Sequence, residues 1–381
     1  MDDRKETQVG DNTRPTRGAE NLVRHELVAM EPYESIAPLE ALSQRAGVPL
    51  ERVIKLDGNE NPYGCSPRVR SALADYSYYH IYPDPMHREL GEELEDYVGI
   101  GREHIVAGSG SDELIDLILR LFLQTGDKVL NCVPTFGMYS FSTTVCGGEI
   151  VNIPRDAAYE IDLTAVKSAI DRRTKVIFIA SPNNPTGNIT SQSTILELLD
   201  TGIIVVVDEA YYEFSGVTAV THVPKYPNLI VLRSFSKWAG LGGLRVGYGI
   251  FPISIAKFIY KIKPPYNVNV AAQIAAKESL VDADYLNSRV RAIITERERL
   301  GDELRTQGVL NPLPSQANFI LCSVVDGNAL KIKNGLEKEG IFIRHFNSSM
   351  LRNMLRISVG KPEHTDALIA ALSKTEGGKG G

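Results

Sequence analysis

The chain has 381 residues, and its 43% hydrophobic and 23% charged content is typical of a globular protein of about two domains. The net charge of −6 at pH 7 gives no support for binding to nucleic acids or other polyanions. No apolar run is long enough to span a membrane, and the first residues do not resemble a signal peptide. The 4 cysteines and 7 histidines lack the spacing of disulfide pairs or metal ligands, so we expect neither a disulfide framework nor a metal site.

The amino-terminal part of the chain changes character near residue 28. Residues 1–27 are polar, charged and aperiodic, which predicts a mobile arm. Beyond them, a short helix is expected at 38–46 and a short strand at 53–56. The polar residues 57–64, with two glycines and a proline, predict a loop after that strand.

A loop of small residues, 106–112 (VAGSGSD), follows a short predicted strand and precedes a helix expected at 113–123. Small residues before a helix leave backbone N–H groups free, and the helix dipole adds to their attraction for an anion. The third glycine of the dinucleotide fingerprint is missing and no Walker lysine follows. The loop therefore favours a single phosphate over a pyrophosphate.

Apolar runs predict the buried strands of a mostly parallel sheet. They lie at residues 128–133, 175–180, 203–207 and 229–232. In such sheets, ligands bind just beyond the carboxyl ends of the strands.

Polar and aromatic residues follow these strands. Phe136 follows the first run, where it could stack on a flat ring or pack in the core. Asn184 lies in the segment SPNNPTG after the second run, where two prolines, a glycine and two asparagines predict a defined turn. Asp208 and Tyr211 follow the third, and a carboxylate at the end of so apolar a strand is costly to bury without a cationic partner.

The loop after the fourth run carries Ser234, Ser236 and Lys237, and Arg245 follows it. A lysine can form a Schiff base, and two hydroxyls with a guanidinium suit a phosphate. Pyridoxal 5′-phosphate (PLP) needs both kinds of partner. A Ser-x-Lys sequence alone is more often a solvated surface loop, so this interpretation depends on the rest of the chain.

The carboxyl-terminal part predicts a second, α+β domain. Residues 270–307 are largely helical in pattern, and strands are expected at 318–322, 341–344 and 354–359 with helices between them. Each of the last two strands carries an arginine that can point inward, Arg344 and Arg356 respectively.

Taken together, the motifs resemble those of known enzymes. SPNNPTG, VVVDEAY, RSFSK and GGLRVGYG, in this order, resemble the fold-type I PLP-dependent aminotransferases. LDGNENPYG, YPDP, GSGSDELID, PTFGMY and GIFIRHF…LRISVGKPEHTDAL are similar to the histidinol-phosphate aminotransferase family within them. The resemblance covers residues 28–372. It implies an α/β fold, with a mostly parallel seven-stranded sheet between helices and a smaller α+β domain built from both chain ends.

The implied domain boundaries follow from the same resemblance. After the arm, residues 28–60 would join the small domain, residues 61–270 would form the large PLP-binding domain, and residues 271–381 would complete the small one. The family also implies a homodimer.

The resemblance further assigns cofactor contacts. Lys237 would bind PLP covalently, Asp208 would pair with the ring nitrogen, Phe136 would stack on the ring, and Asn184 and Tyr211 would bind its phenolic oxygen. The family often has tyrosine at the position of Phe136. The phosphate would be held by Ser111, Asp112, Ser234, Ser236 and Arg245, and by Tyr82 of the partner subunit.

The resemblance implies transfer of an amino group between L-histidinol phosphate and 2-oxoglutarate, with Lys237, Asp208 and Tyr211 as catalytic residues. The substrate would be bound by Tyr33, Asn59, Arg344 and Arg356. The alternatives are an aromatic amino-acid aminotransferase or a phosphothreonine-type decarboxylase on the same fold. A non-catalytic binding protein is a further alternative, which the intact lysine, aspartate and Arg245 argue against. No nucleic-acid or membrane partner is expected. We expect a cytoplasmic protein, or a plastid one if a transit peptide preceded this sequence.

Overall fold

The computed structural model describes residues 18–376 and divides the chain into two units. In its described part, the first unit, Met1–Pro32, contains the short turn η1 (Ala19–Leu22) and the one-turn helix α1 (His25–Val28). The mobile arm predicted for residues 1–27 falls mostly on residues that lie outside the described range. The second unit, Tyr33–Gly381, contains both sheets. No described helix combines the length and apolar character needed to cross a membrane.

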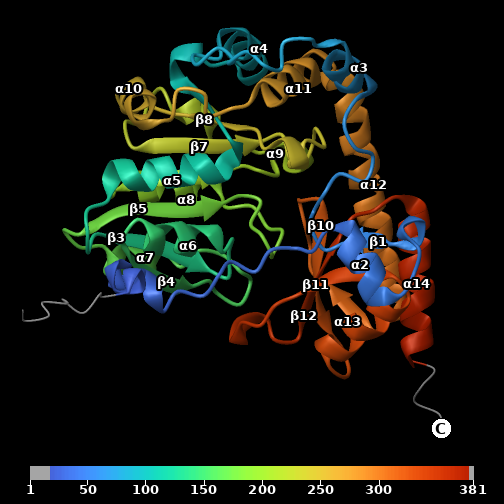
Figure 1. The fold of residues 1–381 in the computed structure, drawn as a ribbon. Helices are drawn as coiled ribbons and strands as arrows, with labels where there is room; N and C mark the ends of the chain where they lie inside the picture. Colours follow the sequence, from blue (N-terminus) through green and yellow to red (C-terminus); the bar gives the residue numbers. More distant parts are fainter. Residues whose placement is uncertain (1–17, 377–381) are drawn as a thin grey trace, which may run out of the picture. The chain divides into compact units, whose positions relative to one another are not determined.

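The larger sheet of the second unit has seven strands (Figure 1). In spatial order they are β2 (Ile105–Gly108), β8 (Gly247–Ile250), β7 (Leu229–Ser234), β6 (Ile204–Asp208), β5 (Thr174–Ala180), β3 (Lys128–Val133) and β4 (Glu149–Pro154). All neighbouring pairs are parallel except those of β8, which runs antiparallel to both β2 and β7. The predicted, mostly parallel seven-stranded sheet is therefore confirmed.

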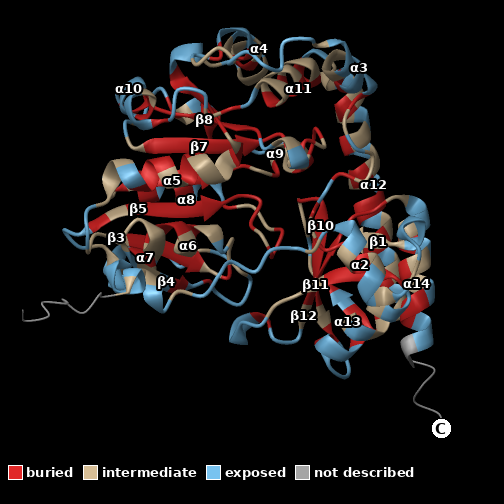
Figure 2. Cartoon of the chain, in the orientation of Figure 1, coloured by how far each residue is buried: buried red, intermediate tan, exposed pale blue. Residues whose placement is uncertain are grey.

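Helices cover both faces of this sheet, which is why its central strands are apolar throughout (Figures 1 and 2). One face packs against α5 (Gly110–Phe122), α6 (Met138–Val145) and α10 (Ile253–Ile262). The other packs against α4 (Arg88–Val98), α7 (Leu163–Ala169) and α8 (Gln192–Leu199). Successive residues of a strand alternate between the two cores, as Val206 and Val207 do. By the same alternation Asp208 faces the α5 side.

The smaller sheet of the second unit has five strands. Its spatial order is β1 (Ile54–Leu56), β11 (Ile341–His345), β12 (Met354–Ser358), β10 (Phe319–Val324) and β9 (Leu310–Pro312). β1 comes from the amino-terminal part and pairs in parallel with β11, so the sheet is built from both ends of the chain, as predicted. The helices of this region are α2 (Leu39–Ala46), α13 (Ala329–Lys338) and α14 (Pro362–Glu376).

The remaining helices connect these parts. The helical stretch predicted for 270–307 is two helices, α11 (Val270–Val281) and α12 (Ala283–Gln307). α11 packs on α4 and on α3 (Pro67–Asp75), whereas α12 contacts α9 (Tyr212–Ser215), β9, β10 and α14. The long helix α12 therefore contacts α9, which follows β6 of the larger sheet, and also two strands of the five-stranded sheet.

Candidate active site

Side chains from both sheets line one cavity of about 590 Å³. It contains every predicted site residue except Tyr82, namely Tyr33, Asn59, Ser111, Asp112, Phe136, Asn184, Asp208, Tyr211, Ser234, Ser236, Lys237, Arg245, Arg344 and Arg356. These residues are spread over more than 300 positions of the sequence. Most of them follow strands of the larger sheet and meet where those strands end. The others come from the strands of the smaller sheet or from the segments beside them.

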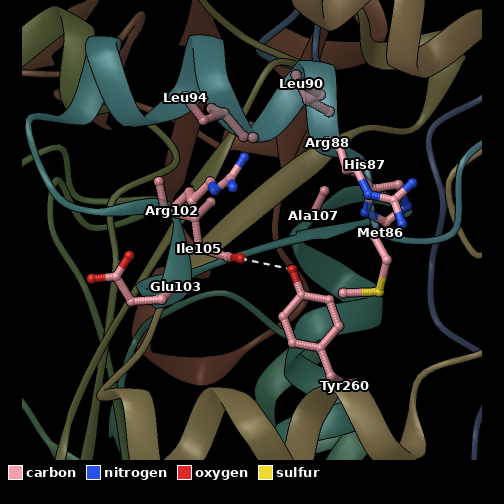
Figure 3. Close-up of a pocket in the computed structure, with 11 residues that line it drawn as sticks. Met86, His87, Arg88, Leu90, Leu94, Arg102, Glu103, Ile105, Ala107 and Tyr260 are labelled. Atoms are coloured by element: carbon pink, nitrogen blue, oxygen red, sulfur yellow. Dashed lines mark hydrogen bonds between the residues drawn. The ribbon is translucent and has the colours of Figure 1, made fainter.

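A second cavity, of about 320 Å³, lies between α4, β2 and α10 (Figure 3). Its lining includes Leu90, Leu94 and Tyr260, whose hydroxyl donates to the carbonyl oxygen of Ile105 over 3.0 Å. None of its lining residues is a predicted site residue. Within residues 18–376, no cluster of His, Cys, Asp and Glu side chains could hold a metal ion. The larger cavity is therefore the candidate active site.

Asp208 is buried at the end of β6, with 4% of its surface exposed. Its Oδ2 accepts a hydrogen bond of 2.8 Å from the hydroxyl of Tyr139, and its Oδ1 accepts one of 3.1 Å from the backbone N–H of Ala210. Burial raises the pKa of Asp208 to about 6, although these two hydrogen bonds oppose the shift. Among the described residues that hydrogen-bond to this carboxylate, none carries a positive charge. The site is therefore suited to a positively charged ligand group.

Lys237 lies in the loop after β7, and its Nζ donates to the carbonyl oxygen of Gly58 over 3.2 Å. Burial in the cavity lowers the pKa of Lys237 to about 8, and the nearby positive charge of Arg356 acts in the same direction. A substantial fraction of this amine is therefore neutral near pH 8. A neutral amine is the form that can attack a carbonyl carbon.

Asn184 and Arg356 are oriented by each other. A guanidinium N–H of Arg356 donates to Oδ1 of Asn184 over 2.6 Å, and another donates to the carbonyl oxygen of Asp57 over 2.5 Å. Because Oδ1 of Asn184 is occupied, its amide NH₂ group is the part left to donate to a ligand. Arg356 is itself buried, with 7% exposure, and burial lowers its pKa.

Tyr211 is held by a network from the small sheet. Its hydroxyl oxygen accepts from Nδ2 of Asn59 over 2.9 Å, and the hydroxyl of Ser358 donates to Oδ1 of Asn59 over 2.9 Å. Asn59 has a positive φ of 52°, a conformation that asparagine tolerates better than most residues. Burial raises the pKa of Tyr211 to about 12, which keeps its hydroxyl protonated and able to donate to a ligand.

At the other end of the cavity, α5 begins at Gly110 and not at residue 113 as predicted, because the carboxylate of Glu113 accepts from the N–H of Ser109 and stabilises an earlier first turn. Ser111 and Asp112 thus lie in the first turn, where backbone N–H groups have no partner within the helix. Arg245 lies beside them and pairs with Asp112 over 2.8 Å. Gly110 has a φ of +78°, and a Cβ there would lie 2.7 Å from the guanidinium of Arg245. Glycine is favoured here by the positive φ, whereas the guanidinium of Arg245 is the flexible end of its side chain and could move away from a Cβ.

Arg344 and Arg356 are directly opposite each other on the antiparallel strands β11 and β12. Like charges in this arrangement repel, and Arg344 contributes to the lowered pKa of Arg356. Arg344 is paired with Glu34 over 3.1 Å. The ring of Tyr33 lies edge-on to Phe136 at 6.5 Å between centroids. Two guanidinium groups on one cavity wall favour an anionic substrate.

Tyr82 does not line the cavity. Its side chain is 77% exposed and stacks on Tyr266, with ring centroids 4.4 Å apart. Tyr82 is thus the one predicted site residue that is not among the residues lining the cavity, all of which lie in the described range 18–376.

The structure also contains a site residue to which the sequence assigned no role. Tyr139 is completely buried, bonds Asp208 and stacks on Phe178 with centroids 4.8 Å apart. In the sequence, the only indication of a role for Tyr139 was its position three residues after Phe136. Its hydrogen-bond partner, Asp208, lies 69 positions further along the chain, so the sequence did not show the contact.

The sequence model of the class I and II aminotransferases matches residues 51–372. A histidinol-phosphate aminotransferase of Dehalococcoides mccartyi is 52% identical over 324 residues, which covers 85% of this chain and 90% of the relative. The chain belongs to the histidinol-phosphate aminotransferase family.

Two further comparisons agree with this family. A chloroplastic member from Nicotiana tabacum is 47% identical over 354 residues, covering 92% of this chain and 86% of the relative. The crystal structure of a Sinorhizobium meliloti histidinol-phosphate aminotransferase in complex with PLP has a TM-score of 0.82 and 26% identity, and the match covers 92% of this chain and 98% of that one. The predicted fold-type I aminotransferase fold and PLP dependence are thereby confirmed.

The residues of the cavity fit PLP by their own chemistry. The buried carboxylate of Asp208 lacks the cation that a protonated pyridine nitrogen would supply. The first turn of α5 and Arg245 offer anion-binding groups for one phosphate, and the amine of Lys237 is available for a carbonyl group. The volume of about 590 Å³ is within the range of small-molecule and cofactor sites.

Proposed function

We propose that this PLP-dependent aminotransferase transfers the amino group of L-histidinol phosphate to 2-oxoglutarate, with imidazole acetol phosphate and L-glutamate as products. The observation that carries the proposal is the pair Arg344 and Arg356, which project from opposite positions of two strands into the cavity that contains Lys237. Both substrates are anions, and a guanidinium can bind a phosphate or a carboxylate through two hydrogen bonds. The name of the Dehalococcoides relative supports the same substrate.

When bound, PLP supplies an electron sink for the bonds around the amino-bearing carbon of the substrate. Asp208 would hold a proton on the ring nitrogen, and Tyr139 orients the carboxylate of Asp208. The amide of Asn184 and the hydroxyl of Tyr211 would donate to the phenolic oxygen. Phe136 would stack on the ring, for which an aromatic side chain without a hydroxyl is sufficient.

The phosphate of the cofactor would be held by the amino-terminal turn of α5 and by side chains around it. They are Ser111, Asp112, Ser234, Ser236 and Arg245. Lys237 would carry the cofactor. Its amine would also act as the general base that takes the proton from the amino-bearing carbon of the substrate, and the pKa of about 8 suits this role near neutral pH.

The substrate is bound from the side of the small sheet. Arg344 and Tyr33 bind the phosphate of histidinol phosphate, which displaces Glu34 from Arg344. Arg356 binds a carboxylate or phosphate while the hydrogen bond to Asn184 fixes its direction. The side chain of Asn59 would contact the substrate at the cavity wall, and it also donates to the hydroxyl of Tyr211.

The proposal includes a homodimer in which Tyr82 of the partner subunit reaches the cofactor phosphate. The 77% exposure of Tyr82 and its stacking on Tyr266 support this, because an aromatic pair on the surface is available to a second subunit. The large domain would span residues 61–270, which include all seven strands of the larger sheet, and residues 28–60 and 271–381 would form the small domain. The location would be cytoplasmic, or plastidic as the name of the tobacco relative states for that protein.

The substrate assignment is tested by glutamate formation from 2-oxoglutarate with different amino donors. Histidinol phosphate should be the best donor, and histidinol without its phosphate should be much poorer. A preference for phenylalanine or tyrosine would indicate an aromatic amino-acid aminotransferase. Release of carbon dioxide from phosphothreonine would indicate a decarboxylase instead.

A further inference from the structure

Three residues that face the proposed cofactor each adjoin a residue packed on the opposite side of the sheet. The pairs of chain neighbours are Asp208–Glu209, Ser234–Arg233 and Lys237–Trp238. In a strand, successive side chains point to opposite faces. Leu232 belongs to the core on the α5 face and Val231 to the core on the other, which places Ser234 with the former and Arg233 with the latter.

Glu209 and Arg233 form a buried ion pair. Nε of Arg233 lies 3.0 Å from Oε2 of Glu209, and their side chains are 4% and 1% exposed respectively. The hydroxyl of Thr218 donates to Oε2 of Glu209 over 2.8 Å and accepts from Nη2 of Arg233 over 2.8 Å. The N–H of Ala219 donates to Oε1 of Glu209 over 2.6 Å, and the ring of Tyr212 lies 3.6 Å from the guanidinium carbon. The pair is therefore satisfied on nearly all sides.

A second contact extends this cluster to the residue after Lys237. Trp238 is completely buried and stacks on Tyr97, with centroids 5.4 Å apart and planes 7° from parallel. The hydroxyl of Tyr97 donates to Oε1 of Glu213 over 3.2 Å, and Glu213 lies on α9 beside Tyr212. Burial raises the pKa of Glu213 to about 7, while the charge of Arg233 opposes that shift. The charged pair and the indole thus belong to one buried region.

The position of the ion pair decides what it can do. The last ladder positions of β6 and β7 pair Asp208 with Leu232, and the N–H of Glu209 donates to the carbonyl oxygen of Leu232 over 2.8 Å. Beyond that bond, the ion pair is a direct side-chain contact between the two strand ends. A buried ion pair adds little net stability compared with apolar residues, because removing both charges from water is costly. Its more specific effect is to fix an arrangement.

We propose that Glu209 and Arg233 are positioning residues, which fix the spacing between Asp208 and Ser234 and hence between the groups that hold the ring nitrogen and the phosphate of PLP. The inference rests on the roles given to Asp208 and Ser234 in the proposed function. A rigid ligand that is held at both ends binds tightly only when both contacts are placed to within about 0.5 Å. The pair acts through its chain neighbours and does not touch the cofactor.

The test uses a double variant, Glu209→Gln with Arg233→Met, which removes both charges together. Either single variant would leave one unpaired buried charge and destabilise the fold, whereas the double variant avoids this. The matched control is Glu296→Gln with Arg299→Met, another acid–arginine pair, which lies on α12 with its carboxylate 6% exposed. Two readouts separate positioning from folding. They are the dissociation constant of PLP from the variant, and the visible circular dichroism of the bound cofactor, which reports its orientation.

We expect the double variant to bind PLP about tenfold more weakly, with altered circular dichroism, while its cofactor-free unfolding midpoint changes far less than that of either single variant. The control pair should bind PLP within about twofold of the parent. If the double variant does not fold, Thr218→Val replaces it, since this change removes the bridging hydroxyl without changing side-chain size. Thr218→Ser keeps the hydroxyl and should restore PLP binding.

Different variants test the proposed function and the positioning role of the ion pair. Unchanged turnover in Lys237→Ala or Asp208→Asn would overturn the proposed function itself. If those variants are inactive but the double variant, or Thr218→Val, binds PLP with parental affinity and circular dichroism, then the ion pair is only a structural contact and the positioning role is wrong.

Discussion

The hydroxyl of Tyr139 donates a 2.8 Å hydrogen bond to Oδ2 of Asp208, so that a fully buried phenol orients the carboxylate at the end of β6. This bond lowers the pKa of Asp208 against the opposing effect of burial. We predict that Tyr139→Phe raises that pKa further and weakens the pairing of Asp208 with the cofactor ring. A hydrogen bond to a charged group contributes about 1.5 kcal/mol or more, so kcat should fall roughly tenfold.

The same variant has a built-in structural control. The phenylalanine ring can keep the stacking contact with Phe178, so the unfolding midpoint should change little. Steady-state kinetics with saturating PLP measure the effect. An unchanged kcat would mean that Tyr139 only fills space beside Asp208.

Asp208→Asn tests the cost of burying the carboxylate in the cofactor-free protein. The folded-state pKa of about 6 lies above the unfolded value, so folded Asp208 binds its proton more tightly. The free energy of unfolding therefore falls as pH rises from about 4 to about 6, by about 2–3 kcal/mol if the full shift holds. The asparagine variant lacks this loss and should be more stable than the parent above pH 6 without cofactor. Urea unfolding at two pH values measures this, and a less stable variant at neutral pH would contradict it.

With the cofactor bound, the same substitution should have the opposite consequence. Loss of the negative charge removes the partner of the protonated ring nitrogen, and turnover should drop about a thousandfold or more. A variant within tenfold of the parent would make Asp208 a structural residue. Measuring stability and turnover on one variant therefore separates the two roles of this carboxylate.

The sequence predicted the strands that are buried on both faces, because they read as continuous apolar runs such as KVIFIA at 175–180. It did not predict β4 at the edge of the sheet, where Glu149 and Asn152 interrupt the apolar pattern. An edge strand is half exposed, so its residues need not be apolar throughout. The register that places Arg344 opposite Arg356 was also beyond the sequence, since it depends on the pairing of β11 with β12.

The site was predictable where a residue's own chemistry marked it. Asp208 was predicted as a site residue because an aspartate after five apolar residues requires a partner, and it lines the cavity. Tyr139, Glu209 and Arg233 were not, because the role of each comes from a side chain many positions away. Arg233 sits 24 positions from Glu209, and only the pairing of β6 with β7 brings them together. Positioning residues of this kind follow from tertiary structure.

Lys237 should carry the cofactor, and its lowered pKa predicts a specific pH dependence. Covalent capture of PLP uses the neutral amine, so its rate should rise with pH and level off above about 8, where an ordinary lysine would continue to gain up to about 10. Stopped-flow mixing of cofactor-free protein with PLP measures this rate. Lys237→Ala should show no capture and no turnover. Near-native transamination by that variant would contradict the whole assignment.

Tyr82 should act in the partner's site if the proposed homodimer is correct. Two inactive homodimers, one carrying Tyr82→Ala and the other Lys237→Ala, should regain activity when their subunits exchange. Each hybrid dimer then has one site with both residues intact. Subunit exchange is verified first with differently tagged chains. No regain of activity after exchange would place Tyr82 outside the partner's site.

Arg344 should select for the phosphate of the substrate. Its guanidinium is paired with Glu34, whose side chain is 67% exposed, so a phosphate can displace that carboxylate at little cost. A charge-assisted hydrogen bond contributes about 1.5–3 kcal/mol, and Arg344→Ala should lower kcat/KM for histidinol phosphate about ten- to a hundredfold. Arg344→Lys should recover only part of this loss, because an ammonium group cannot bind the phosphate through two parallel bonds.

For unphosphorylated histidinol, the loss of kcat/KM in Arg344→Ala should be much smaller, since that substrate never used the contact. Equal losses on both substrates would show that Arg344 supports the site in another way, while the aminotransferase assignment would stand.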